Sequence, residues 1–112
     1  PFLVFLADNG GNLAYVSGGG NRSFADLDLT TLPCRLAVDG AVVHEQAGGH
    51  PQGDPIEPIR TYLEHANDRL GGLRAGHLVT TGSLNKPLRL DKPAVIEAIL
   101  PGLGGARLDV TA

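Results

Sequence analysis

The feature that most constrains the fold is an alternating stretch that ends in a tight turn. Apolar side chains occupy every second position at Leu32, Cys34, Leu36 and Val38, and Asp39-Gly40 then separates this run from a second apolar run. Alternation with a period of two is typical of a half-buried strand, and Asp-Gly favours the type I′ turn of a two-residue hairpin. The pattern therefore predicts a β-hairpin. Cys34 falls on its apolar face, which favours a buried structural thiol over a nucleophile.

A helix is predicted after a Gly-rich loop. Asp54 is a suitable N-cap, Pro55 suits the first helical position, and Glu57 completes a capping box. Pro58 lacks the N–H of an internal helical bond, so a start at Glu57 is the alternative. Apolar residues then repeat at helical spacing and Gly71-Gly72 ends the run. These apolar residues are Ile59, Tyr62, Leu63, Ala66 and Leu70.

Four further segments have strand-like patterns. They are Phe2 to Leu6, His77 to Gly82, Pro93 to Leu100 and Ala106 to Thr111. Together with the hairpin they predict one β-rich domain over residues 1–112 with one main helix, and no linker or repeat divides it. The chain has 16 Gly and 8 Pro but only 3 Phe, 2 Tyr and no Trp, so its core must depend on aliphatic side chains. We expect such a thin core to be completed by another surface.

Composition also excludes several classes of partner. The formal net charge is −3 and the basic residues do not cluster, which argues against binding to nucleic acid or to an anionic membrane. The apolar start, Pro1 to Ala7, is too short to span a membrane and has no basic flank. A single cysteine forms no internal disulfide. We therefore expect a cytoplasmic protein.

The segment T-T-G-S-L, from Thr80 to Leu84, carries the clearest functional signal. A Thr-Gly-Ser turn after a β-type run exposes backbone N–H groups and a hydroxyl, and Gly82 allows a close approach to the backbone. This chemistry suits a carboxylate. The alternative is an ordinary turn whose hydroxyls cap backbone groups.

Four motifs together indicate a family. A-D-N at Ala7 to Asn9, G-D-P at Gly53 to Pro55, L-R-A-G at Leu73 to Gly76 and T-T-G-S-L occur in an order that resembles the C-terminal part of the 2-keto-4-pentenoate hydratases and related 2-oxo-acid decarboxylases, in the fumarylacetoacetate hydrolase superfamily. The resemblance implies an α+β fold, a mixed β-roll of the fumarylacetoacetate-hydrolase type with one main helix.

The resemblance also implies an activity. Such enzymes hydrate a 2-hydroxy-2,4-dienoate, the enol form of a 2-oxo acid, during the degradation of aromatic compounds, with Mg²⁺ or Mn²⁺ bound to the substrate. By alignment of the T-T-G-S-L motif, Ser83 donates to the substrate carboxylate, Thr81 lies beside it, and the backbone of Gly82 and Leu84 shapes the turn. Asp8, in the A-D-N motif, is the candidate catalytic residue that binds or orients the metal or its water; an Asp that caps a turn is the alternative.

This chain departs from the family pattern at three places. Gly10, Gly11 and Asn12 replace small hydroxyl residues after A-D-N, His77 replaces an Asp, and Pro93-Ala94 replaces a Gly-Asp turn. The family's Glu-x-Glu metal-binding motif is expected to precede the point where this sequence starts. The resemblance therefore predicts that residues outside this sequence supply the metal ligands.

Other candidate residues carry weaker signals. A hard cation needs about three carboxylates, and Asp26 with Asp28 supply only two. His50, in the loop before the helix, is a possible acid or base but is more often a solvated residue at such a position. Lys86 is a candidate to screen an anionic substrate, and a solvated lysine is the alternative.

Three functions stay open at this stage. The first is a hydratase or related lyase acting on a small 2-oxo acid, assembled as a homo-oligomer or with a second chain that supplies the remaining ligands. The second is a non-catalytic assembly subunit. The third is a module that binds 2-oxo acids without turning them over. An acidic metal-ligand cluster would discriminate the first from the others.

Overall fold

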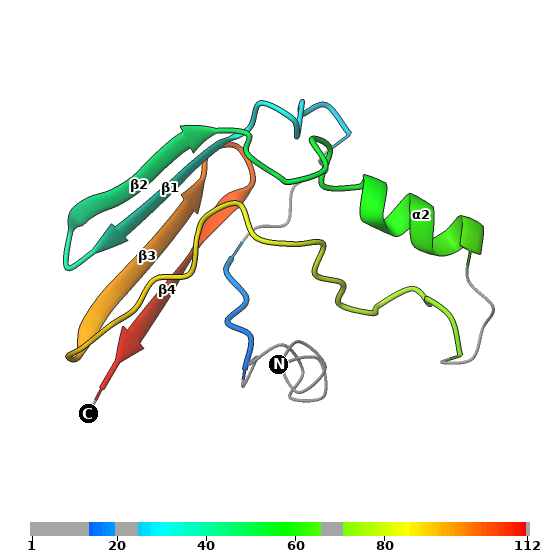
Figure 1. Cartoon of the computed structure of the whole chain (residues 1–112). Helices are drawn as coiled ribbons and strands as arrows, with labels where there is room; N and C mark the ends of the chain where they lie inside the picture. Colours follow the sequence, from blue (N-terminus) through cyan, green and yellow to red (C-terminus); the bar gives the residue numbers. More distant parts are fainter. Residues whose placement is uncertain (1–13, 20–24, 66–70, 112) are drawn as a thin grey trace, which may run out of the picture.

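The computed structural model describes residues 14–19, 25–65 and 71–111, and they form a sheet with one helix to its side (Figure 1). The elements are β1 (Pro33–Val38), β2 (Ala41–Ala47), α2 (Glu57–His65), β3 (Ala94–Leu100) and β4 (Gly104–Val110). The strand predicted at Phe2 to Leu6 lies outside the described residues. No helix in the described part is long and apolar enough to cross a membrane.

The predicted hairpin is confirmed as β1 and β2. Asp39 and Gly40 both have positive φ, 49° and 80°, as a type I′ turn requires. The Asp39 N–H donates to the Val95 carbonyl over 2.8 Å, and the Asp39 Oδ1 accepts from the Val95 N–H over 2.9 Å. These two bonds join the turn to β3, so a local turn signal also fixes a contact between distant parts of the chain.

The four strands form one antiparallel sheet in the order β2-β1-β3-β4. Strands β3 and β4 confirm the two predicted C-terminal strands, although β4 begins at Gly104, two residues before the predicted start. Leu36 of β1 lies opposite both His44 of β2 and Ala98 of β3. Because these residues are directly paired, their side chains share one face of the sheet.

The two faces of the sheet differ in character. Loop segments cover the face that carries Cys34 and Leu36, and only 8% of Cys34 is exposed, which confirms the predicted burial. Burial raises the pKa of the Cys34 thiol, as expected of an unreactive structural cysteine. On the other face Arg107 makes ion pairs of 3.1 Å with Glu97 and with Asp109. Such exposed pairs contribute little stability.

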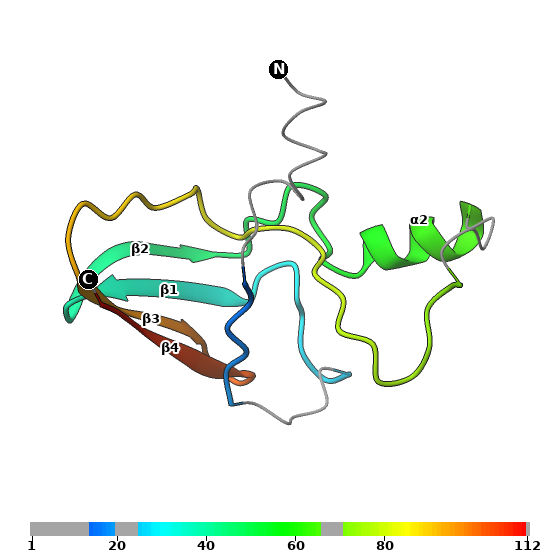
Figure 2. The same cartoon turned by 90° about the horizontal axis from the view of Figure 1, so that it is seen from below.

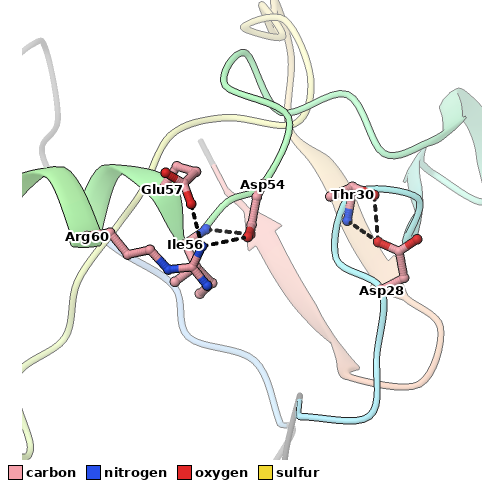
Figure 3. A network of polar contacts seen from close by, with 6 residues as sticks. All are labelled: Asp28, Thr30, Asp54, Ile56, Glu57 and Arg60. Carbon is pink, nitrogen blue, oxygen red and sulfur yellow. Dashed lines mark hydrogen bonds and ion pairs between the residues drawn. The ribbon is translucent and has the colours of Figure 1, made fainter.

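Helix α2 begins at Glu57, which confirms the alternative start imposed by Pro58. The predicted N-cap at Asp54 is therefore wrong, because Ile56 supplies the first helical carbonyl, which accepts from the Arg60 N–H over 3.1 Å. Asp54 instead forms the turn before the helix: its Oδ1 atom accepts from the Ile56 N–H over 2.9 Å (Figure 3), and its carbonyl accepts from the Glu57 N–H over 3.1 Å. Arg60 pairs with Glu57 in the first turn. No residue of α2 is buried. The predicted continuation through Ala66 to Leu70 lies outside the described residues.

The strand predicted at His77 to Gly82 is wrong. The chain from 71 to 93 runs back from the helix to β3 without pairing to any described strand (Figure 2). Leu78 is 74% exposed, and Thr80 contacts the Tyr15 hydroxyl over 3.5 Å. Alternation predicts an extended conformation, but a strand also needs a neighbour with free backbone groups. A four-stranded antiparallel sheet does not identify the β-roll, so the β-roll stays a prediction.

Candidate functional site

The segment from Ser83 to Leu88 forms one wall of a groove of about 640 Å³. The opposite wall is the β1–β2 hairpin, which contributes Leu36 and Val43. The polar side chains along the groove are His44, Gln46, Ser83, Asn85 and Lys86. The structure thus places the predicted substrate-binding residues Ser83 and Leu84 in a concave site. Of the other predicted substrate-binding residues, Thr81 lines a separate hollow beside α2, and Gly82 lines neither of these two sites.

His50 holds the start of the turn. Its Nε2 atom lies 2.8 Å from the Thr81 carbonyl oxygen, and its Nδ1 atom accepts the Gln52 N–H over 3.2 Å. Only 7% of His50 is exposed. The interpretation as a solvated loop residue is therefore wrong, because a carbonyl 31 positions later in the chain provides the buried ring with a partner.

Gln46 holds the end of the turn. Its Nε2 atom donates to the Leu84 carbonyl over 2.8 Å and to the Gly48 carbonyl over 3.1 Å. Gln46 is not among the residues predicted from the sequence to form the site. Its place on the covered face, opposite Cys34, was the only signal that could have found it.

Gly82 lies between these two attachment points. Its φ is 132°, and a Cβ atom at this position would lie 2.9 Å from the His50 Nε2 atom. The sequence predicts that glycine at position 82 allows a close approach to the backbone. In the structure the group that approaches is the His50 imidazole, which lies closer to the Gly82 backbone than a methyl group would allow.

The charge of the groove suits an anion. No Asp or Glu is among the described residues that line it, and Lys86 forms no ion pair with the part of the chain that the structure describes. The His44 Nε2 atom has no hydrogen-bond partner among the described residues, but it is inaccessible to solvent and so does not face a ligand in the groove. The Ser83 hydroxyl and the Asn85 amide add neutral hydrogen-bonding groups. A carboxylate would therefore meet donors and no opposing charge.

The described residues do not fit a complete metal site. No group of three or more His, Cys, Asp or Glu side chains lies close enough among them to hold a metal ion. Asp28 accepts hydrogen bonds from the Thr30 and Thr31 hydroxyls, which lower its pKa. Its carboxylate is thus used within its own loop. Asp8, the predicted catalytic residue, lies outside the described residues.

Comparisons with known proteins support the family predicted from the motifs. The chain is 32% identical over 111 residues to a 2-keto-4-pentenoate hydratase of Burkholderia vietnamiensis, which covers 98% of this chain and 42% of that protein. It is 31% identical over 109 residues to 2-keto-4-pentenoate hydratase 3 of Pseudomonas putida, covering 96% of this chain and 40% of that protein. No family model and no solved structure matches the chain.

A second activity appears among the relatives. A 4-oxalocrotonate decarboxylase of Pseudomonas putida is 27% identical over 102 residues, which cover 91% of this chain and 39% of that protein. The chain thus spans about two fifths of the length of the curated relatives it matches. The chain belongs to the family of the 2-keto-4-pentenoate hydratases and 4-oxalocrotonate decarboxylases.

Proposed function

We propose that this chain forms the carboxylate-binding side of the active site of a lyase that hydrates a 2-hydroxy-2,4-dienoate, the enol form of a 2-oxo acid. The observation that carries the proposal is that the T-G-S segment is attached at both ends and that its Ser83 lies in a groove with no Asp or Glu among the described residues that line it. The names of its relatives supply the reaction class, since they include hydratases and a decarboxylase that act on small oxo acids. We expect the activity in the cytoplasm and in aromatic catabolism.

In this proposal the groove binds and orients the substrate. The Ser83 hydroxyl donates to the substrate carboxylate, Thr81 and the backbone of Gly82 and Leu84 shape the turn, and Lys86 adds a positive charge along the same wall. A hydroxyl that donates to an anion contributes more than one that donates to a neutral group. The main role of the described residues is therefore positioning.

The resemblance also implies Mg²⁺ or Mn²⁺, which would polarise the oxo group when bound. Because the described residues do not fit a metal site, we assign no step to the metal. We propose that its carboxylate ligands come from Asp8 and from residues of the same protein or of a second chain, including another copy in a homo-oligomer. The alternative, a non-catalytic subunit or a module that binds oxo acids without turnover, is favoured by the same missing cluster.

Two measurements test the proposal. We expect 2-oxopentanoate to bind the 112-residue chain, and Ser83→Ala to weaken binding by roughly tenfold, as for the loss of one hydrogen bond to a charged group. Ser17→Ala, at an exposed serine away from the groove, is the matched control. The second measurement follows the ultraviolet absorbance of 2-hydroxypenta-2,4-dienoate with Mg²⁺ and then with excess chelator.

The outcomes separate the alternatives. Metal-dependent loss of absorbance would mean that the chain completes its own site. Binding without turnover would support the binding module or assembly subunit for the chain on its own. Equal affinity of the wild type and of Ser83→Ala would refute the assignment of Ser83 to the substrate carboxylate.

A further inference from the structure

We infer that His50 is a positioning residue, which sets the place of the Ser83 hydroxyl by holding the Thr81 carbonyl with a neutral, Nε2-protonated imidazole. This inference rests on the proposed function for its consequence on ligand binding. Its structural part, the protonated nitrogen and the attachment of the turn, stands on the contacts alone.

The contacts identify the tautomer. The Gln52 N–H points at the His50 Nδ1 atom over 3.2 Å, so Nδ1 accepts and carries no proton. A neutral imidazole has one donor and one acceptor, which leaves the proton on Nε2. That nitrogen lies 2.8 Å from the Thr81 carbonyl oxygen, which only accepts hydrogen bonds. The neutral ring with its proton on Nε2 therefore satisfies both hydrogen bonds, one as donor and one as acceptor.

The turn depends on few other attachments. The segment from 71 to 93 forms no ladder with a described strand, so its backbone is not held by sheet hydrogen bonds. His50 binds the carbonyl of residue 81 and Gln46 binds that of residue 84. Ser83 lies between these two points. Its hydroxyl is therefore placed by the two side chains, one at each end of the turn.

The ring also limits the shape of the turn. A Cβ atom at Gly82 would lie 2.9 Å from the His50 Nε2 atom, which is closer than real Cβ atoms come to a neighbour. Since only 7% of His50 is exposed, the ring has little room to move away. His50 thus fixes the Gly82 backbone by contact as well as the Thr81 carbonyl by a hydrogen bond.

The test combines three variants with a ligand-independent readout. His50→Leu removes both ring hydrogen bonds, and His50→Gln keeps a side-chain N–H that can reach the Thr81 carbonyl. His65→Leu is the control, because His65 is exposed on α2 and its Nδ1 atom contacts the Thr61 carbonyl of the same helix. The affinity for 2-oxopentanoate is measured by calorimetry. Imidazole ¹⁵N spectra and amide hydrogen exchange are recorded by NMR without ligand.

We expect the ¹⁵N spectrum of the wild type to show a protonated Nε2 and an unprotonated Nδ1. We expect His50→Leu to weaken binding about tenfold and to speed exchange of the amides of residues 82–85, while β1–β4 keep their protection. His50→Gln should recover most of the affinity. His50→Leu should have little further effect in a Ser83→Ala background, since the ring acts through that hydroxyl.

The results that overturn the inference differ from those that overturn the proposed function. A proton on Nδ1, or unchanged exchange of residues 82–85 in His50→Leu, would refute the attachment whether or not any ligand binds. A full effect of His50→Leu in the Ser83→Ala background would refute the action through Ser83. Failure of the wild type to bind 2-oxopentanoate, with exchange changed as expected, would refute the proposed function and leave the attachment established.

Discussion

The sheet and the segment from 71 to 93 are held by different means. In the sheet, three antiparallel ladders join neighbouring strands through backbone hydrogen bonds. The segment from 71 to 93 makes no such ladder in the described part of the chain, and side chains such as Gln46 and His50 attach it. Ladders depend weakly on side-chain identity, whereas a side-chain attachment is lost with a single substitution.

The difference shows how the candidate site is built. The hairpin provides a rigid wall with Gln46 on it, and the loop that follows the hairpin provides His50. The T-T-G-S-L segment is then placed against this wall. Binding residues on loops positioned by a rigid scaffold are a common arrangement, and the loops open at lower free energy than the scaffold.

The largest expected effect comes from a charge placed in the covered face of the sheet. Cys34 is 8% exposed in β1, and Cys34→Asp would bury a carboxylate without a partner. We expect a loss of about 3 kcal/mol or more in the free energy of unfolding, because unpaired buried charge is costly. Both regions should unfold together, since the turn depends on the hairpin. Urea unfolding followed by circular dichroism measures this loss.

The matched control is Val42→Asp in the neighbouring strand, where the side chain is 42% exposed. Its new carboxylate stays hydrated, so the loss should be much smaller. Equal losses for the two variants would mean that the face carrying Cys34 is not covered in solution.

The sequence predicts the sheet well where the signal is local. Asp39-Gly40 requires positive φ at two positions and so locates the turn, and the alternation from Leu32 to Val38 indicates the first strand. Pro58 similarly locates the start of α2, whereas Asp54 forms the turn before the helix and is not its N-cap. Each of these depends on residues within a few positions of one another. The sequence pattern does not predict the register shift between Leu36 and Ala37.

The site is predicted less completely because its contacts join distant residues. The motif identifies Ser83, and the pattern from His77 to Gly82 indicates an extended chain, but neither reveals whether a strand lies alongside. The contact between His50 and Thr81 spans 31 positions, and that between Gln46 and Leu84 spans 38. A histidine or a glutamine without a visible partner is predicted to be solvated, so both roles were missed.

A smaller loss of stability is expected from a substitution at Gly49, in the loop that follows β2 and carries His50. Gly49 has a φ of 105°, and a Cβ atom there would lie 1.7 Å from the Gln46 Nε2 atom. Gly49→Ala therefore adds backbone strain and displaces the amide that binds Leu84. We expect a loss of about 2 kcal/mol in the free energy of unfolding and faster amide exchange at residues 82–85.

Gly53→Ala provides the matched control, because Gly53 also has a positive φ, 76°, but a Cβ atom there meets nothing within 4 Å. Gly53→Ala should lower the free energy of unfolding by about 1 kcal/mol through backbone strain alone, and amide exchange at residues 82–85 should not change. Faster exchange at these residues in both variants would contradict the role of Gln46 as the attachment point.

The smallest effect concerns Asp28, whose loop precedes β1 and lies close to the start of α2 (Figure 3). Its carboxylate accepts from the Thr30 Oγ1 atom over 2.6 Å, the Thr31 Oγ1 atom over 2.9 Å and the Thr30 N–H over 2.9 Å. These bonds lower its pKa from 3.8, the value expected of an unfolded chain. The stabilisation is therefore complete above that value and is lost as the pH falls through the lower pKa of the folded state.

The test compares the wild type with Asp28→Ala in urea at a series of pH values. The difference in the free energy of unfolding should be constant at neutral pH and should shrink below a pH near 3.8. A Thr30→Val, Thr31→Val double variant removes both hydroxyl donors, so NMR titration should show a higher pKa for Asp28 in it. A difference that persists unchanged in acid would mean that these bonds do not hold the charged carboxylate, and that the loop before β1 depends on packing alone.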